Sequence, residues 1–362
     1  MHSAGRRSAP VRLQGVRECC RIHLAQPRAG DARPPLAASA PSRRPFSRVL
    51  SSSAVRPAYR LLTAALILLA CAGASAAPAS GPAEDSPTLR KIRESGVVTL
   101  GYRESQFPFS YLDDAQRPIG YTMDICERIV DAIKRRLGLR DLERRYVPVT
   151  SATRIPLVSN GTVDLECGVT TNTLERQREV AFTITTFVAE SRLLSRKTAP
   201  VTRLDELRGK VVTSTVGTTS LSHLQELYAG RGIDMTILAA KDDPDAFRLV
   251  QTGRADAYAM DDALLHGTIA RSGQAGDYVV SSERLAVEPY GIMLAKGDPA
   301  FKHLADTVIV GLFRSGDIYA LYGHWFQSPI PPKGINLAFP LFPSMRHLVA
   351  EPTDSADPAM YP

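Results

Sequence analysis

Apolar residues recur along this chain at two spacings, one typical of helices and one typical of buried strands. The helical spacing predicts amphipathic helices over residues 89–94, 123–137, 221–228, 246–253, 263–270 and 300–315. Short apolar runs between them predict strands over residues 97–102, 146–148, 163–169, 211–213 and 255–260. Because strands and helices alternate, we expect an α/β fold with mainly parallel sheets.

Two longer β-rich passages, residues 182–197 and 288–295, flank one α/β unit. They predict two lobes joined by two crossover strands, each lobe a mainly parallel sheet flanked by helices. The expected boundaries are 88–188 with 292–352 for lobe 1 and 189–291 for lobe 2. The last ten residues have no periodic pattern, and we expect them to be held loosely.

Charge is distributed unevenly along the chain. The net charge is +7, but residues 1–60 hold twelve Arg and only two acidic residues, a local balance of +10. The remaining residues therefore carry a net charge of −3. The positive total does not describe the folded part of the chain, and we expect no nucleic-acid partner.

The region before residue 77 has the features of a secretory signal peptide over residues 56–76. A basic stretch at 56–60 precedes an apolar run at 61–72, and Ala74-Ser-Ala76 is a typical cleavage site. A competing interpretation is a lipoprotein box at 68–71 with a lipid on Cys71, but ordinary cleavage and a periplasmic location are favoured. Residues 1–55 are expected to be disordered, or to be upstream sequence translated from a start codon that was assigned too early.

Two cysteines remain in the body of the chain, Cys126 on an expected helix and Cys167 in an expected strand. Two buried thiols are the favoured interpretation, and the sequence leaves a disulfide open. The spacing fits no zinc site. The chain has neither a P-loop nor a G-x-G-x-x-G motif, so no cofactor is expected and any ATPase must be a separate protein.

The candidate binding residues begin with the stretch 151–182. Ser151 is a suitable N-cap for a helix that contains Arg154, and the following strand runs into a threonine-rich turn before Arg176. Open α/β sheets bind ligands at the carboxyl ends of their strands, and Arg presents a planar fork of donors that matches a carboxylate. This pattern predicts a site for a small carboxylate. The competing interpretation is a solvated helix and an ordinary turn.

Two further stretches have the same double interpretation. Gly217-Thr-Thr-Ser220 precedes a helix, so its N–H groups and hydroxyls can bind a carboxylate or simply cap the helix. Asp261 and Asp262 follow a strand, where one can hold an ammonium group and the other can cap the next helix.

Taken together, several short motifs resemble one family. They are Gly101-Tyr-Arg-Glu-Ser105, Thr150-Ser-Ala-Thr-Arg154, Asn160-Gly-Thr-Val-Asp164, Glu166-Cys-Gly168, Thr171-Asn172 with Glu175-Arg176, Gly217-Thr-Thr-Ser220, Met260-Asp-Asp-Ala-Leu-Leu265 and Ser328-Pro-Ile-Pro-Pro332. The set resembles the glutamate/aspartate-binding proteins of bacterial ABC importers, which are type II periplasmic solute-binding proteins of family 3. The resemblance covers roughly residues 88–352.

The resemblance implies a role for each matching position. The residues implied to hold the ligand's α-carboxylate are Arg176, Thr171 and Thr219. The residues implied to face its side-chain carboxylate are Arg103, Ser151 and Arg154. Asp261 would take the α-ammonium group.

Two positions depart from the family pattern. Val169 stands where a Ser is usual, and Asp243 stands where a His helps to bind the distal carboxylate. A negative charge at Asp243 would repel such a carboxylate at a cost of about 1–4 kcal/mol. Either Asp243 points away, for example to pair with Arg103 or Arg154, or the ligand is glutamine, asparagine or an amino acid with a cationic tail.

We therefore expect a monomeric protein that captures a polar amino acid, most simply glutamate or aspartate, by hinge closure and delivers it to a membrane ABC permease. A module that signals ligand occupancy to a membrane receptor is one alternative. An enzyme of the dehydratase type is another, with Glu104 or Asp243 as general acid.

Overall fold

The computed structural model describes residues 86–362, so the predictions for the N-terminal extension, the signal peptide and Cys71 lie outside the described residues. The helices are α2 (Pro87–Ser95), α3 (Tyr121–Leu137), α4 (Arg154–Ser159), α5 (Thr219–Arg231), α6 (Asp243–Gln251), α7 (Asp262–Ser272), α8 (Pro299–Ser315), α9 (Asp317–Gln327) and α10 (Pro343–Ala350). In residues 86–362, no helix has the length and apolar character needed to cross a membrane.

The strands alternate with these helices, as the hydrophobic pattern predicts. They are β1 (Val97–Tyr102), β2 (Ser105–Gln106), β3 (Ser110–Leu112), β4 (Pro118–Ile119), β5 (Glu143–Pro148), β6 (Leu165–Glu166), β7 (Val180–Phe182), β8 (Phe187–Arg196), β9 (Val211–Thr215), β10 (Thr236–Ala240), β11 (Ala257–Asp261), β12 (Tyr278–Val280), β13 (Ala286–Tyr290) and β14 (Met293–Ala295).

Local hydrogen bonds and glycine conformation set the ends of the first helix. Ser86 caps α2, and Gly96 ends it in the left-handed conformation at φ 66°.

Two sheets form the centres of two lobes, which confirms the expected fold class. The first has the strand order β5-β1-β6-β14-β7, and the second has the order β10-β9-β11-β8-β12 with β13 also paired to β8. Strands β5, β1 and β6 are parallel to one another, as are β10, β9 and β11. Strands β8 and β14 pair antiparallel with these cores, β12 and β13 pair antiparallel with β8, β7 pairs antiparallel with β14, and β2, β3 and β4 form a small separate sheet.

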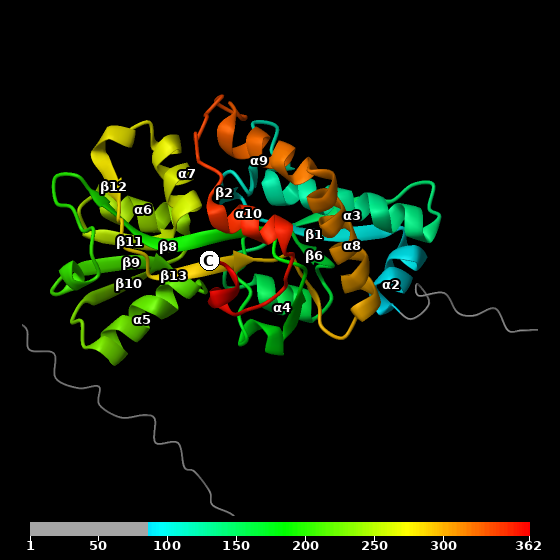
Figure 1. Cartoon of the computed structure of the whole chain (residues 1–362), viewed down its shortest axis with the longest axis horizontal. Helices are drawn as coiled ribbons and strands as arrows, with labels where there is room; N and C mark the ends of the chain where they lie inside the picture. Colours follow the sequence, from blue (N-terminus) through cyan, green and yellow to red (C-terminus); the bar gives the residue numbers. More distant parts are fainter. Residues whose placement is uncertain (1–85) are drawn as a thin grey trace, which may run out of the picture. The chain divides into compact units, whose positions relative to one another are not determined.

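Strands β8 and β13 run side by side between the two groups of elements (Figure 1). On one side of them lie β9 to β12 with α5, α6 and α7, and on the other lie β1 and β6 with α2, α3, α4 and α8. The backbone N–H of Thr186 donates to Tyr290 and that of Gly291 to Thr170 (2.8 and 3.0 Å), which ties the crossing strands to the end of β6. These strands are where the chain passes between the lobes.

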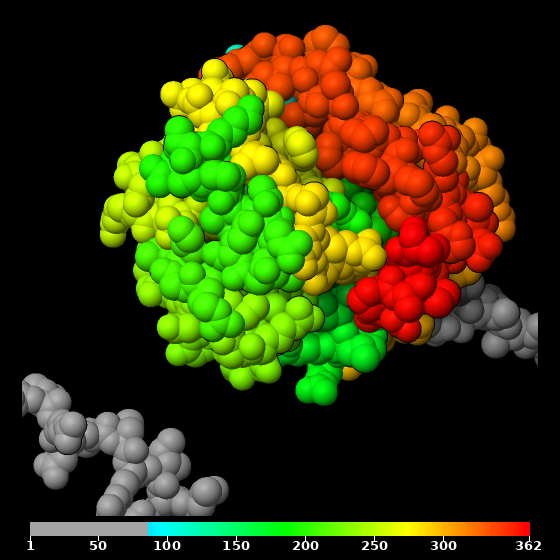
Figure 2. All heavy atoms as spheres, turned by 60° about the vertical axis from the view of Figure 1, so that its left-hand side comes forward, coloured from blue at the N-terminus to red at the C-terminus, as the bar shows by residue number. Residues whose placement is uncertain are grey.

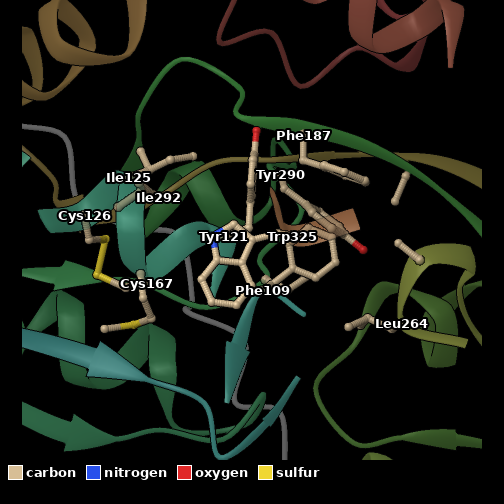
Figure 3. Close-up of a cluster of buried hydrophobic side chains, with 14 of the residues drawn as sticks. Phe109, Tyr121, Ile125, Cys126, Cys167, Phe187, Leu264, Tyr290, Ile292 and Trp325 are labelled. Carbon is tan, nitrogen blue, oxygen red and sulfur yellow. A yellow bond between two sulfur atoms is a disulfide. The ribbon is translucent and has the colours of Figure 1, made fainter. Parts of the chain in front are cut away.

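Aromatic side chains fill the core beneath the crossing strands (Figure 3). Phe187 of β8 stacks on Tyr290 of β13 at 5.8 Å between ring centroids, and Phe109 meets both rings edge to face. All three are buried. Such packing fixes the ring of Tyr290, whose hydroxyl reaches the candidate site described below.

Cys126 and Cys167 form a disulfide, so the expectation of two free thiols is wrong. The bond joins α3 to the residue that follows β6 and lies in the same buried cluster (Figure 3). A separation of 41 residues hides the proximity of the two thiols in the sequence, and only the packing of α3 on the first sheet brings them together.

The C-terminal residues are anchored, contrary to the expectation of a loose tail. Figure 2 shows them, in red, packed on the surface beside the yellow chain that includes β13. The Tyr361 side chain is 2 % exposed and its hydroxyl lies 2.8 Å from that of Thr185, while Thr185 N–H donates to the Thr353 carbonyl. One buried aromatic ring therefore holds a segment that has no periodic pattern.

Candidate ligand-binding site

A narrow cavity of about 10 Å³ lies where the two lobes meet. Its lining comes from both lobes and consists of Gln106, Ser151, Arg154, Val169, Thr171, Thr218, Thr219, Met260, Asp261 and Leu264. Five of the eight site residues predicted from the sequence line this cavity, namely Ser151, Arg154, Thr171, Thr219 and Asp261. Arg103, Arg176 and Asp243 are buried close by.

A tight turn before α4 presents Ser151 and Arg154 to the cavity. Thr150 and Thr153 exchange hydrogen bonds between backbone N–H and side-chain hydroxyl (3.0 and 3.1 Å), and α4 begins only at Arg154. The prediction that Ser151 caps this helix is wrong, because the threonine pair builds the turn instead. The Ser151 hydroxyl is buried and has no hydrogen-bond partner within residues 86–362.

Arg154 is a buried cation whose environment contains both signs of charge. One guanidinium nitrogen donates to the Val169 carbonyl and to the Thr170 hydroxyl, and Nε has no partner among the described residues. The pKa of Arg154 is lowered to about 9, mainly by burial and then by the charge of Arg176, while Glu166 raises it. The side chain therefore remains a charged donor at neutral pH. A side chain of that type binds anions.

Glu166 is an acid in this site that the sequence analysis did not assign a role. It is fully buried on β6, and its Oε2 accepts a hydrogen bond from the Thr170 hydroxyl at 2.7 Å, so Thr170 links it to Arg154. A Cβ on Gly168 would lie 2.2 Å from Glu166 Oε1 and 2.8 Å from Arg103 Cγ, so Gly168 lets these side chains come together. A charged residue inside a buried apolar strand was the signal that could have revealed it.

Arg176 connects the two lobes. It donates to the Thr171 carbonyl on one side (2.8 Å) and to the Gly217 carbonyl on the other (3.2 Å). Gly217 has φ 79°, and a Cβ there would lie 2.7 Å from the Ser151 carbonyl oxygen, so only glycine fits this contact between lobes. Burial lowers the pKa of Arg176, and Glu288 and Asp261 counteract that shift.

Asp261 and Asp262, which the sequence offers for an ammonium contact and a helix cap, make different contacts. Asp262 accepts hydrogen bonds from the N–H groups of Glu190 (3.1 Å) and Ala263 (2.8 Å), whereas Asp261 makes no capping bond and lines the cavity. The Tyr290 hydroxyl donates to Asp261. The pKa of Asp261 is raised to about 8, mainly by burial and then by the charges of Glu288, Asp262 and Asp243, while the hydrogen bond from Tyr290 lowers it.

Glu288 is a second acid to which the sequence pattern gives no role, although it begins the second β-rich passage. It is 1 % exposed on β13, and its Oε2 accepts from the Thr219 hydroxyl at 2.8 Å. Its Oε1 lies 3.2 Å from His223 Nε2, and this hydrogen bond raises the pKa of His223. The Thr219 hydroxyl lies in turn 3.4 Å from that of Thr171, so the network reaches across the cleft.

Asp243 is the first residue of α6 and is buried. It accepts a hydrogen bond from the Thr215 hydroxyl at 2.6 Å, and in the described part of the chain it forms no ion pair with Arg103 or Arg154. It lines a neighbouring cavity together with Phe107 and Arg271. Its charge still raises the pKa of Arg154, so it acts on the site through space.

The site therefore contains two groups of residues with different charge. The Arg154 group consists of Arg103, Ser151, Arg154, Glu166 and Asp243. The Arg176 group consists of Thr171, Arg176, Thr219, Asp261 and Glu288. Two cations face two acids in the Arg154 group, whereas one cation faces two acids in the Arg176 group.

Residues 98–328 match the family described as "Bacterial extracellular solute-binding proteins, family 3". The chain belongs to this family. The match covers most of the described residues of this solute-binding protein. The fold and the cleft between its two lobes agree with this family.

Two curated relatives are similar over most of their length. A protein of Pseudomonas aeruginosa named "L-glutamate/L-aspartate-binding protein" is 47% identical over 270 residues, 74% of this chain and 89% of that protein. A protein of Escherichia coli named "Glutamate/aspartate import solute-binding protein" is 43% identical over 294 residues, 81% of this chain and 97% of that protein. Both names describe binding proteins and not enzymes.

Solved structures share the fold at lower identity. A mutant of the arginine-binding protein of T. maritima superposes with a TM-score of 0.57 at 28% identity, covering 66% of this chain and 98% of that chain. An ancestral amino acid-binding protein described as a precursor of cyclohexadienyl dehydratase has a TM-score of 0.57 at 25% identity, with coverage of 66% and 100%.

Proposed function

We propose that this solute-binding protein captures an acidic α-amino acid, glutamate or aspartate, in the cleft between its lobes and delivers it to an ABC permease. The observation that carries the proposal is the set of buried donors that have no partner among the described residues, the Ser151 hydroxyl and Arg154 Nε, beside a cavity that Asp261 also lines. Buried polar groups are normally hydrogen-bonded, so such donors favour an anionic ligand. Two similar relatives carry glutamate and aspartate in their names.

The Arg176 group suits the α-carboxylate and the α-ammonium. Arg176 already spans both lobes, and Thr219 lies in the first turn of α5, where backbone N–H groups have no intrahelical acceptor and favour an anion. Asp261 is the buried acid that lines the cavity, and it supplies the acceptor for an ammonium group. Thr171 adds a hydroxyl from the opposite lobe.

The Arg154 group suits the side-chain carboxylate. Arg103 and Arg154 are both more than nine-tenths buried, and Arg103 Nη1 has no hydrogen-bond partner within residues 86–362. Ser151 lies beside them on the turn before α4. A charge-assisted hydrogen bond from each arginine would contribute more than a neutral one, which supports a free carboxylate as the preferred distal group.

Binding and lobe closure are one process in this proposal. The contacts between lobes, Arg176 to the Gly217 carbonyl and Thr171 to Thr219, exist only when the lobes meet at the cleft. Rotation about β8 and β13 would open the cleft and release the ligand. A ligand that contacts both lobes shifts the population toward the closed form by its differential affinity.

Delivery requires a membrane permease and a separate ATPase, and we place the mature monomeric protein in the periplasm. The signal peptide at 56–76, cleavage in preference to a lipid on Cys71, and the lobe boundaries 88–188 with 292–352 and 189–291 belong to the same proposal. Fractionation of the producing cells together with mass spectrometry of the mature N-terminus tests the location, and light scattering tests the monomer.

The binding proposal is tested by thermal unfolding of the purified protein with each of the twenty amino acids at millimolar concentration, followed by calorimetry. A true ligand raises Tm by several degrees through mass action. We expect the largest rise with glutamate or aspartate. A rise with glutamine, asparagine or a basic amino acid alone would correct the ligand class, and no response to any amino acid would overturn the proposal.

A further inference from the structure

Glu288 lies beside the candidate site without belonging to any of the contacts assigned to the ligand. Its side chain is 1 % exposed, and both carboxylate oxygens have partners, the Thr219 hydroxyl and His223 Nε2. Within residues 86–362 it forms no ion pair with Lys or Arg, and its partner His223 is 27% exposed. Burying a carboxylate without a cationic Lys or Arg partner reduces the stability of the fold. We therefore looked for a function of the Glu288 charge in the binding site.

The hydrogen bond to Glu288 determines how Thr219 faces the cavity. A hydroxyl carries one hydrogen, and that of Thr219 is donated to Glu288 Oε2 at 2.8 Å. The oxygen lone pairs of Thr219 then remain for the cavity and for Thr171, whose hydroxyl lies 3.4 Å away. The Thr219 side chain is therefore an acceptor, while its backbone N–H at the start of α5 remains a donor for a carboxylate.

Building on the proposed function, we propose that Glu288 is a positioning residue that makes the cleft selective for ligands with an ammonium group. It orients Thr219 as an acceptor and adds its negative charge to the one that Asp261 carries when an ammonium ligand is bound. A dicarboxylate without an amine would then meet two acids and one arginine, Arg176, in the same group. Hydrogen bonds connect the three charged residues: Thr171, beside Thr219, accepts from Arg176 through its carbonyl, and the Ser220 hydroxyl next to Thr219 donates to Asp261 at 3.4 Å.

The test compares L-glutamate with glutarate, the same dicarboxylate without the ammonium group, by calorimetry on the wild-type protein and on E288Q. Gln keeps the size of Glu288 and an oxygen acceptor but removes the charge. We expect E288Q to reduce the affinity ratio of glutamate over glutarate at least tenfold, and E288D to restore part of it. E226Q is the matched control, because Glu226 also contacts His223 but is 75% exposed.

Two further measurements distinguish a loss of selectivity from a folding defect in E288Q. The NMR titration of the His223 imidazole should move to lower pH in E288Q, which reports the lost carboxylate in a folded protein. T219V, which removes the oriented hydroxyl at a partly exposed helix start but leaves the Glu288 side chain and its His223 partner in place, should lower the same ratio.

Each outcome has a distinct meaning. A wild-type ratio in both E288Q and T219V, with glutamate bound by the wild type, would overturn the role of Glu288 and leave the proposed function intact. A wild-type protein that binds no amino acid would overturn the proposed function and this inference with it.

Discussion

The Arg154 group and the Arg176 group lie beside the same cavity, yet they differ in charge and in how they are held. In the Arg154 group, two arginines face Glu166 and Asp243, and the formal charges cancel. In the Arg176 group, one arginine faces Asp261 and Glu288, and the formal balance is negative. Within residues 86–362, the Arg154 group has donors without a partner and also one unpartnered oxygen each on Glu166 and Asp243, whereas the carboxylates of the Arg176 group are hydrogen-bonded to Tyr290, Thr219 and His223.

This difference indicates two modes of recognition in one cleft. The Arg176 group, in which the acids have fixed hydrogen bonds, selects ligands that carry an ammonium group next to a carboxylate. A balanced group with free donors is more tolerant, because small changes in its charge decide between a carboxylate and an amide. Substitutions in the Arg176 group should therefore affect all ligands, and those in the Arg154 group should affect ligand choice.

The largest effect is expected from R176A. It removes the cation that links the lobes and faces the α-carboxylate, so the affinity for every amino acid ligand should fall at least about 100-fold, which corresponds to loss of charge-assisted hydrogen bonds. Calorimetry with the preferred ligand measures it. R178A is the control, because Arg178 is exposed on the same turn. Binding within fivefold of the wild type would contradict the role of Arg176.

The next effect concerns ligand choice and comes from D243N. Asp243 acts on Arg154 through its charge, so removing that charge should raise the preference for glutamate over glutamine about tenfold. Separate titrations with the two ligands give the ratio. D245N removes an acid from the same first turn of α6 and controls for effects on the helix end. An unchanged ratio of glutamate over glutamine affinity in D243N would mean that the charge of Asp243 does not affect ligand binding.

The sequence predicted the regular elements well because hydrophobic spacing is a local property. Strand β1 has the predicted bounds, and α2 ends at the glycine expected to stop it. The N-cap assignment of Ser151 failed because Thr150 and Thr153 bond to each other, and propensity alone cannot choose among neighbouring hydroxyls.

The composition of the site was predicted only in part. Eight residues were named from motifs, and the structure brings five of them to one cavity and buries the other three close by. Glu166 and Glu288 were missed because their roles depend on partners distant in sequence or on a side chain's burial. The Cys126–Cys167 bond was left open for the same reason, since its two ends meet only through packing.

A smaller effect should appear when the pH is varied, and it belongs to the Arg176 group. The pKa of Asp261 is raised to about 8, mainly by burial and then by Glu288, so the unliganded protein holds a proton there at neutral pH. An ammonium ligand requires the ionised form. Affinity for glutamate should therefore increase about fivefold from pH 7 to pH 8, where the ionised fraction rises from about a tenth to a half.

Calorimetry in buffers of different ionisation enthalpy provides the check. Binding at pH 7 should release about 0.9 proton, the fraction carried by an acid of that pKa. The E288Q variant should shift the pH dependence to lower pH, since one neighbouring charge is gone. Affinity that stays constant from pH 6.5 to pH 8, with no proton released, would exclude Asp261 as the ammonium partner.

The smallest effect on binding is expected from the disulfide, although its effect on stability is large. Closing a loop of 41 residues should stabilise the fold by about 2–4 kcal/mol, so reduction should lower Tm by several degrees. The glutamate affinity of the reduced protein at 25 °C should change less than twofold, because both sulfurs lie in the core of the first lobe and not in the cavity lining. The C126A/C167A variant should show no response to reductant. A large loss of affinity on reduction would instead mean that this bond holds the end of β6, and with it Glu166 and Thr170, in the geometry that the Arg154 group needs.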